Sequence, residues 1–314
     1  MDRHTETESD TVVAGGTGRR LAKAIGLVCL YAFSWLVVSL LLLGVAKVIL
    51  GSVIDSMDDA TEMAYEGIFM VVAVAFINFT LFRVFKSTAA WDGWPGLRLG
   101  LSGFGTGALV GLGMAAGMFV LTVLAGGGSF SLDGSPWTEY VLRVASLLLF
   151  VLVSTLGEEA LFRGYPMTIL ARATSPGWAN LLMAILFSAM HASSTGFNGM
   201  VAFNIVIGSL VVGALRFTKG GIPAAWGFHF AWNGLQVVAG SPLTGLEMDI
   251  PGLHYAGKGP DWLSGGALGP EGGIGATLST LIVLTIMGLC FRQTGNVNLP
   301  LPFGRPPSRN ELSV

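Results

Sequence analysis

Eight apolar runs of roughly membrane-spanning length limit the folds open to this sequence. A helix needs about 20 mostly apolar residues to cross a hydrocarbon core of about 30 Å, so the shorter runs lie near the lower limit. The sequence therefore predicts an all-α polytopic membrane protein, a helical bundle with about eight transmembrane helices. The runs cover residues 24–50, 67–85, 104–125, 140–156, 178–191, 200–217, 222–239 and 274–291.

The composition agrees with a membrane protein. Of the 314 residues, 52% are hydrophobic and 11% are charged, and the mean hydropathy is +0.68. A soluble domain has about 25% charged residues. The 45 glycines also fit this class, because small residues let transmembrane helices approach closely. The net charge of −2 predicts no nucleic-acid partner.

The distribution of Lys and Arg predicts the orientation. If the N-terminus lies inside, only Lys47, Arg143 and Lys258 of the 17 basic residues fall on the outer side. Cytoplasmic loops are enriched in these residues, so both termini are expected in the cytoplasm. We expect a disordered cytoplasmic tail over residues 1–20, transmembrane helices over 21–139, a functional core over 140–240, an extracytoplasmic loop over 241–273, a last transmembrane helix over 274–292 and a cytoplasmic tail over 293–314.

Three short polar motifs lie in the apolar core segment and predict an intramembrane polar site. A charged side chain at bilayer depth costs at least ~2.5–3.5 kcal/mol on insertion scales, so such residues are functional candidates. The motifs are Glu158-Glu159-x-x-x-Arg163, Phe187-x-x-x-His191 and His229-x-x-x-Asn233.

The two adjacent glutamates have different expected roles. Glu159 and Arg163 are four residues apart, so they share a helix face and can form an ion pair that supports the helix. Glu158 points about 100° away around the same helix. A second carboxylate next to Glu159 makes ionisation of one of them more costly, which suits a proton-transferring group. We therefore predict a catalytic role for Glu158.

A simple height calculation predicts that Glu158 faces His191. We assume one helix over residues 140–173 and a turn at Pro176. Glu158 lies 18 residues before this proline and His191 lies 15 residues after it, so their heights differ by ~4–5 Å at 1.5 Å per residue. By the same calculation, His229 would lie ~9 Å lower than His191. His229 can therefore reach Glu158 and His191 only if its helix is tilted or the turns lie at unequal depths.

Several other chemistries have no support in the sequence. There is no His-Glu-x-x-His motif of a helical zinc protease, and no aspartate lies within an apolar run. A Gly-x-Ser-x-Gly nucleophile elbow is also absent from the sequence. Asn204, in the run 200–217, is a polar residue with no predicted role.

The three motifs, in this order and spacing, resemble those of the CPBP family, which comprises CAAX prenyl proteases and bacteriocin-processing membrane proteases and is also called Abi. The resemblance covers residues 140–240. It implies an intramembrane endopeptidase whose substrate is a peptide or a lipidated protein, located in a bacterial plasma membrane. In the family pattern, Glu158 and His191 activate water, His229 and Asn233 stabilise the oxyanion, and Glu159, Arg163 and Phe187 support the site.

Two questions stay open at the level of sequence. Either Glu158 acts directly as a general base, or His191, His229 and Glu158 hold Zn²⁺ and leave one position for water. The alternative to proteolysis is a membrane scaffold or small-solute transporter that uses the same polar cavity. The sequence does not predict an oligomeric state.

Overall fold

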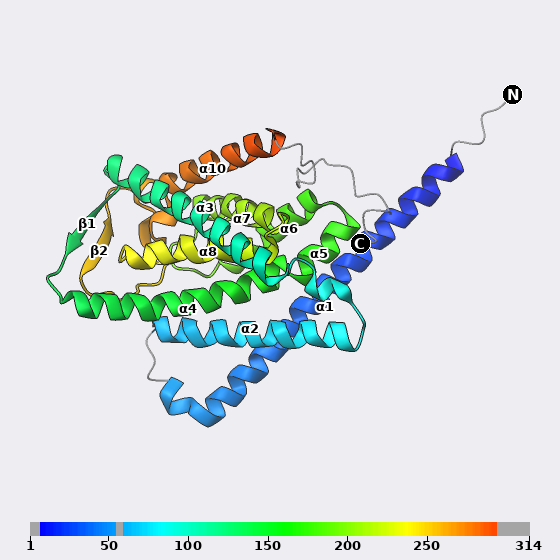
Figure 1. Cartoon of the computed structure of the whole chain (residues 1–314), viewed down its shortest axis with the longest axis horizontal. Helices are drawn as coiled ribbons and strands as arrows, with labels where there is room; N and C mark the ends of the chain where they lie inside the picture. The colour runs from blue at the N-terminus through cyan, green and yellow to red at the C-terminus, as the bar shows by residue number, and fades with distance from the viewer. Residues whose placement is uncertain (1–6, 55–58, 294–314) are drawn as a thin grey trace.

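A computed structural model describes residues 7–54 and 59–293 of the chain. Each of the eight predicted apolar runs lies largely within a helix, so the all-α class is confirmed (Figure 1). The helices are α1 (Thr7–Ile54), α2 (Asp59–Arg83), α3 (Leu97–Leu124), α4 (Trp137–Arg163), α5 (Tyr165–Ala173), α6 (Pro176–Met190), α7 (Gly199–Arg216), α8 (Gly221–Val238), α9 (Asp261–Ser264) and α10 (Ile274–Gln293).

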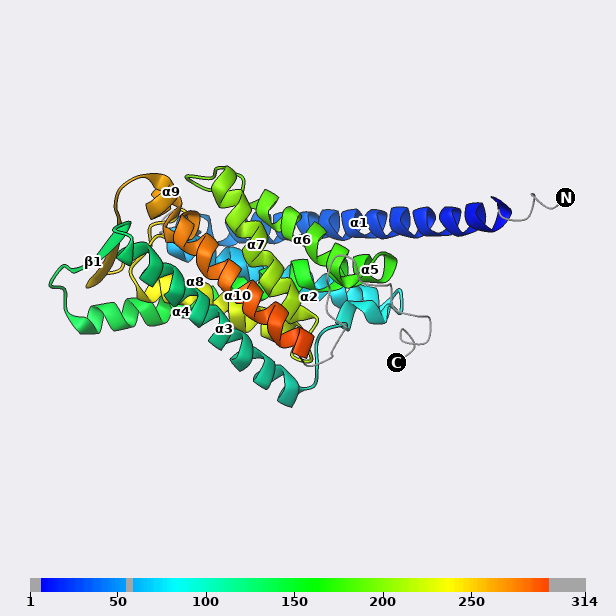
Figure 2. The same ribbon diagram turned by 90° about the horizontal axis from the view of Figure 1, so that it is seen from above.

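The terminal segments differ from the prediction or lie outside the described residues. The tail expected over residues 1–20 is helical from Thr7 onward, where α1 begins. Residues 1–6 and 294–314, which include nearly all of the predicted C-terminal tail, are outside the described ranges. Figure 2 shows α1 extending well beyond the other helices.

Four helical segments are long and apolar enough to cross a membrane. They are Gly18–Ile49, Leu97–Leu124, Trp137–Ala173 and Gly199–Arg216, and shorter apolar helices cover Gly67–Arg83, Pro176–Met190 and Ile274–Cys290. A helical membrane bundle is therefore consistent with the structure, and the number of eight crossings stays a prediction. The first segment has only 6% of its most apolar part buried by protein, so lipid is expected to cover most of its surface.

The predicted single helix over residues 140–173 is wrong, because the chain breaks at Gly164. This residue has ψ −127° and separates α4 from α5. A side chain could not be accommodated here, since a Cβ atom on Gly164 would lie 2.2 Å from the Ala160 carbonyl oxygen. Pro166 adds to the break because it lacks the N–H of a helical hydrogen bond. The predicted turn after α5 is confirmed: Ser175 caps α6 and accepts a hydrogen bond from the Trp178 N–H.

A seam of glycines lets α3 and α8 pack with their backbones in contact. A Cβ atom on Gly107 would lie 1.9 Å from the Ala224 carbonyl oxygen, and one on Gly111 would lie 2.2 Å from that of Phe228. On the opposite helix, a Cβ atom on Gly227 would lie 2.0 Å from the Phe104 carbonyl oxygen. Small residues permit this close approach between membrane helices. The seam fixes α8, the helix that carries His229 and Asn233.

Two strands at one end of the bundle join the connection between α3 and α4 to the connection between α8 and α10. β1 (Gly128–Leu132) pairs antiparallel with β2 (Leu253–Gly257), with Phe130 opposite Tyr255 (Figure 1). The exposed Asp133 carboxylate follows β1 and hydrogen-bonds the His254 ring and the Gly252 N–H. The bond with His254, followed by backbone N–H donors, holds the pKa of Asp133 below its ordinary value.

The connection between α8 and α10, residues 239–273, returns toward the bundle after β2. It contains α9 and two short 3₁₀ turns, η2 (Gly266–Leu268) and η3 (Pro270–Gly272). Another 3₁₀ turn, η1 (Thr88–Trp91), connects α2 and α3. We refer to residues 239–273 as the α8–α10 connection.

Candidate functional site

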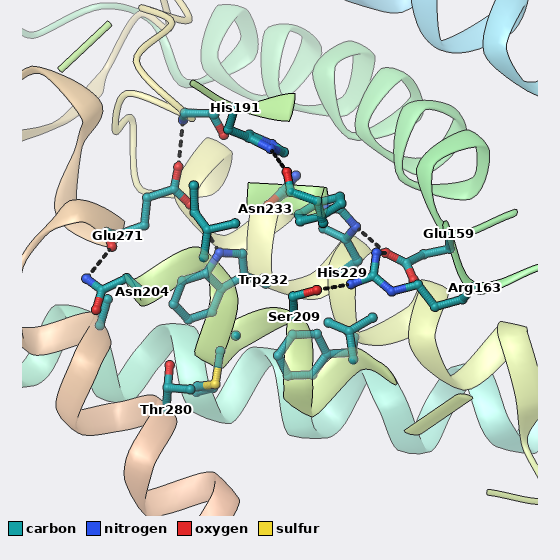
Figure 3. Close-up of a pocket in the computed structure, with 18 residues that line it drawn as sticks. Glu159, Arg163, His191, Asn204, Ser209, His229, Trp232, Asn233, Glu271 and Thr280 are labelled. Atoms are coloured by element: carbon teal, nitrogen blue, oxygen red, sulfur yellow. Dashed lines mark hydrogen bonds and ion pairs between the residues drawn. The ribbon is translucent and has the colours of Figure 1, made fainter. Parts of the chain in front are cut away.

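A cavity, with about 630 Å³ of empty space including space open to solvent, lies among α4, α6, α7, α8 and α10. All three predicted motifs contribute to its lining, together with residues of the α8–α10 connection (Figure 3). From the motifs, the lining residues are Glu159, Arg163, Phe187, His191, His229 and Asn233.

A buried ion pair forms one wall of the cavity. The Arg163 Nη1 donates to Glu159 Oε1 at 3.2 Å, and the two side chains are 1% and 0% exposed. Arg163 Nη2 also donates to the Ser209 hydroxyl of α7 at 2.6 Å. The same Glu159 oxygen lies 2.8 Å from His229 Nδ1. The ion pair that the i, i+4 spacing predicts is present, and it also holds a histidine of a second motif.

The contact with Glu159 defines the tautomer of His229. An ionised carboxylate only accepts hydrogen bonds, so the Nδ1 of His229 must be the donor. In the neutral ring the Nε2 atom is then an acceptor. This atom is 3.9 Å from Glu158 Oε2. His229 therefore lies between the two glutamates, with one nitrogen directed to each.

Glu158 occupies a different environment from Glu159. Its side chain is 24% exposed, and it is not among the residues that line the cavity. The predicted direct pairing with His191 is not found, because the histidine within 4 Å of this carboxylate, in the described part of the chain, is His229. The height calculation assumed a continuous helix through Gly164, where the chain breaks.

His191 stands just beyond the end of α6, in the turn that leads to α7. Its Nδ1 is 2.8 Å from the carbonyl oxygen of Phe187, the last-turn residue of that helix. The Phe187 ring contacts both histidines, with its centroid 4.7 Å from the His191 ring and 5.9 Å from the His229 ring. The Arg163 guanidinium lies 4.6 Å from the same ring centroid. Phe187 therefore packs against both imidazoles and the cation.

Asn233 lies one turn after His229 on α8 and also lines the cavity. The expected i, i+4 relation places both side chains on the same helix face. Within the described residues, no protein hydrogen bond occupies the Asn233 amide. It can therefore donate to a group that enters the cavity.

A second buried arginine holds the end of α4. Arg216, at the end of α7, is 7% exposed, and its Nε donates to the Arg163 carbonyl oxygen at 2.8 Å. Its Nη2 donates to the Asp92 carbonyl oxygen and the Thr168 hydroxyl. The break at Gly164 would otherwise leave the last carbonyls of α4 without partners. Arg216 thus fixes the helix end that carries the glutamates.

Two functional candidates were missed by the motif analysis. Ser209 contacts Arg163, and Glu271 lines the cavity from the α8–α10 connection. Serine is common in apolar helices, and Glu271 lies in a segment without periodicity, so neither had a local signal. The structure also explains Asn204, whose Nδ2 donates to the carbonyl oxygens of Glu271 and Gly273, each at 3.0 Å.

The predicted zinc ligands, His191, His229 and Glu158, are not gathered into one cluster in this arrangement. Among residues 7–54 and 59–293, no group of three or more His, Cys, Asp or Glu side chains is gathered to hold a metal ion. His229 uses one ring nitrogen for Glu159, and His191 uses one for the Phe187 carbonyl.

The geometry defines a helical integral membrane protein with a polar site between its helices. Residues 140–235 match the family model described as type II CAAX prenyl endopeptidase Rce1-like. The predicted family resemblance is thus confirmed for this segment, which runs from α4 to α8 and contains all three motifs. Comparisons with curated proteins and with solved structures found no match.

We predict that Glu159→Gln destabilises the protein far more than Glu158→Gln. Removing one partner of a buried ion pair typically costs about 3–5 kcal/mol because the other charge stays uncompensated. Glu158 is partly exposed, and its loss should cost less than about 1 kcal/mol. Equilibrium unfolding of the two variants in the same detergent measures the difference. Equal losses would contradict the structural role assigned to the Glu159–Arg163 pair.

Proposed function

We propose that this protein is an intramembrane endopeptidase that hydrolyses a peptide bond of a membrane-associated peptide or lipidated protein. The proposal depends on the position of His229. Its Nδ1 contacts the buried Glu159, and its Nε2 lies next to Glu158. The match of residues 140–235 to an endopeptidase family supports the same reaction class.

In the proposed mechanism, Glu158 is the general base. A water between its Oε2 and His229 Nε2, which are 3.9 Å apart, loses a proton to this pair as its oxygen attacks the scissile carbonyl carbon. General-base catalysis of this type typically contributes about 10²–10⁴-fold in rate. The proton then moves to the amide nitrogen, the C–N bond breaks, and an amine and a carboxylic acid are released.

The cavity-lining polar groups have complementary roles in this proposal. The Asn233 amide donates to the oxyanion, and His229 can do so once it is protonated. Donors that are fixed before the reaction stabilise developing charge strongly in a site without bulk water. His191 packs against the same Phe187 ring as His229 and completes the polar lining. Glu159 and Arg163 position His229 rather than react.

The alternative function is a non-proteolytic scaffold or small-solute transporter that uses the same cavity. The match of residues 140–235 to an endopeptidase family model favours hydrolysis, and the Glu158–His229 pair is suited to general-base catalysis.

Purified Glu158→Gln protein is expected to remain folded and to lose peptide cleavage by at least about 10²-fold, since the amide cannot accept a proton. Glu139→Gln is a matched control, because Glu139 is an exposed glutamate in the first turn of the same helix. Mass spectrometry of peptides incubated in detergent or vesicles measures cleavage. Full activity of Glu158→Gln would exclude the proposed base.

We propose that the glutamate acts without a resident metal. Purified protein should then contain no stoichiometric zinc by elemental analysis, and cleavage should persist after incubation with a chelator. Stoichiometric metal, together with loss of cleavage on chelation and recovery on zinc addition, would instead support His191, His229 and Glu158 as ligands.

We propose that the protein lies in a bacterial plasma membrane with both termini in the cytoplasm. The proposal depends on the excess of Lys and Arg in the segments assigned to the inner side. Reporter fusions at the two ends should both give cytoplasmic signals. A periplasmic signal from one end alone would require an odd number of crossings, and periplasmic signals from both ends would reverse the predicted orientation.

A further inference from the structure

The cavity has a second carboxylate, Glu271, on the side opposite Glu159 (Figure 3). It belongs to η3 in the α8–α10 connection. Its Oε1 accepts from the Thr244 N–H at 2.8 Å, and its Oε2 accepts from Trp232 Nε1 at 3.2 Å and from Gln236 Nε2 at 3.3 Å.

The Glu271 carboxylate has no cationic partner among the described residues. Arg163 is the Lys or Arg side chain that lines the cavity, and it pairs with Glu159 at 3.2 Å. In the described part of the chain, no Lys or Arg nitrogen lies within 4 Å of the Glu271 carboxylate. Hydrogen-bond donors therefore surround this carboxylate without an ion pair.

The position of Glu271 is strictly fixed. Asn204 donates to its carbonyl oxygen and is itself held by the Thr277 hydroxyl at 2.6 Å. Thr244, whose N–H contacts the carboxylate, has φ +53°, which is unfavourable for a β-branched residue. Strained residues of this kind are concentrated at functional sites, where the surrounding structure maintains them.

We propose that Glu271 determines substrate specificity by binding a cationic side chain of the peptide. The proposal rests on the proposed endopeptidase function. Trp232 and Gln236 lie three and seven residues after His229 on α8, a rise of ~4.5–10 Å. An extended peptide advances ~3.3 Å per residue. The basic residue is therefore expected within about three positions of the scissile bond.

A cation fits this position better than a neutral side chain. A charge pair in a site with little water is stronger than the same pair at the surface. The hydrogen bonds from Thr244, Trp232 and Gln236 locate the carboxylate without neutralising it. A lysine or arginine in the substrate would neutralise it.

The test compares two peptides that differ only by lysine or its uncharged isostere norleucine, placed two or three residues from the cleaved bond. Wild-type protein should cleave the lysine peptide with a kcat/KM at least about tenfold higher, in line with the effect of a buried charge pair. Glu271→Gln should reduce this ratio to near one, and Glu271→Asp should retain a preference for lysine. Glu247→Gln, an exposed glutamate of the same connection, should leave the ratio unchanged.

The outcomes separate specificity from a structural role. If Glu271→Gln lowers cleavage of both peptides equally, Glu271 only anchors the connection and the proposal is wrong. If Glu271→Gln does not fold, the kcat/KM ratios of wild type and Glu271→Asp for the two peptides decide the question. Equal cleavage of the two peptides by wild type overturns the proposal. If wild type cleaves neither peptide, the endopeptidase function fails, and equal binding of the two peptides then rejects the cation site separately.

Discussion

The buried ion pair between Glu159 and Arg163 is the interaction on which the site depends. It is almost completely removed from solvent, so each partner needs the other and further hydrogen bonds. Those bonds come from Ser209 on α7 and His229 on α8. An ion pair that is local in sequence therefore joins three helices. The orientation of the proposed catalytic histidine follows from satisfying a buried charge.

Most of the fold could be predicted from the sequence, because hydrocarbon imposes a simple requirement on the chain. Apolar runs must be helical to satisfy their backbone groups, and helices cover all eight runs. The break at Gly164 had a local signal, because a glycine followed two residues later by Pro166 disfavours a continuous helix. The height calculation ignored that signal and assumed one continuous helix.

The motif spacing predicted that the three motifs lie together, but it did not predict which side chains are in contact. Residues of all three motifs line one cavity, but the neighbour of Glu158 is His229 and not His191. Pairing across helices depends on rotation and tilt, which spacing within one helix does not define. Glu271 was beyond the reach of pattern analysis for a related reason. Its place in the cavity depends on contacts with Asn204, Trp232 and Gln236, which the fold alone brings together.

The helix α8 is constrained from two sides, and this explains how an irregular connection can contribute to a site of fixed geometry. On one side, Gly107 and Gly111 allow the α3 backbone to touch it. Toward the α8–α10 connection, its Trp232 and Gln236 donate to Glu271. Rotation of α8 would break both sets of contacts, so the directions of His229 and Asn233 are set jointly by a tight helix seam and an anchored loop. A substitution in either region should therefore alter the positions of His229 and Asn233 by moving α8, even if the substituted residue does not contact the reacting groups.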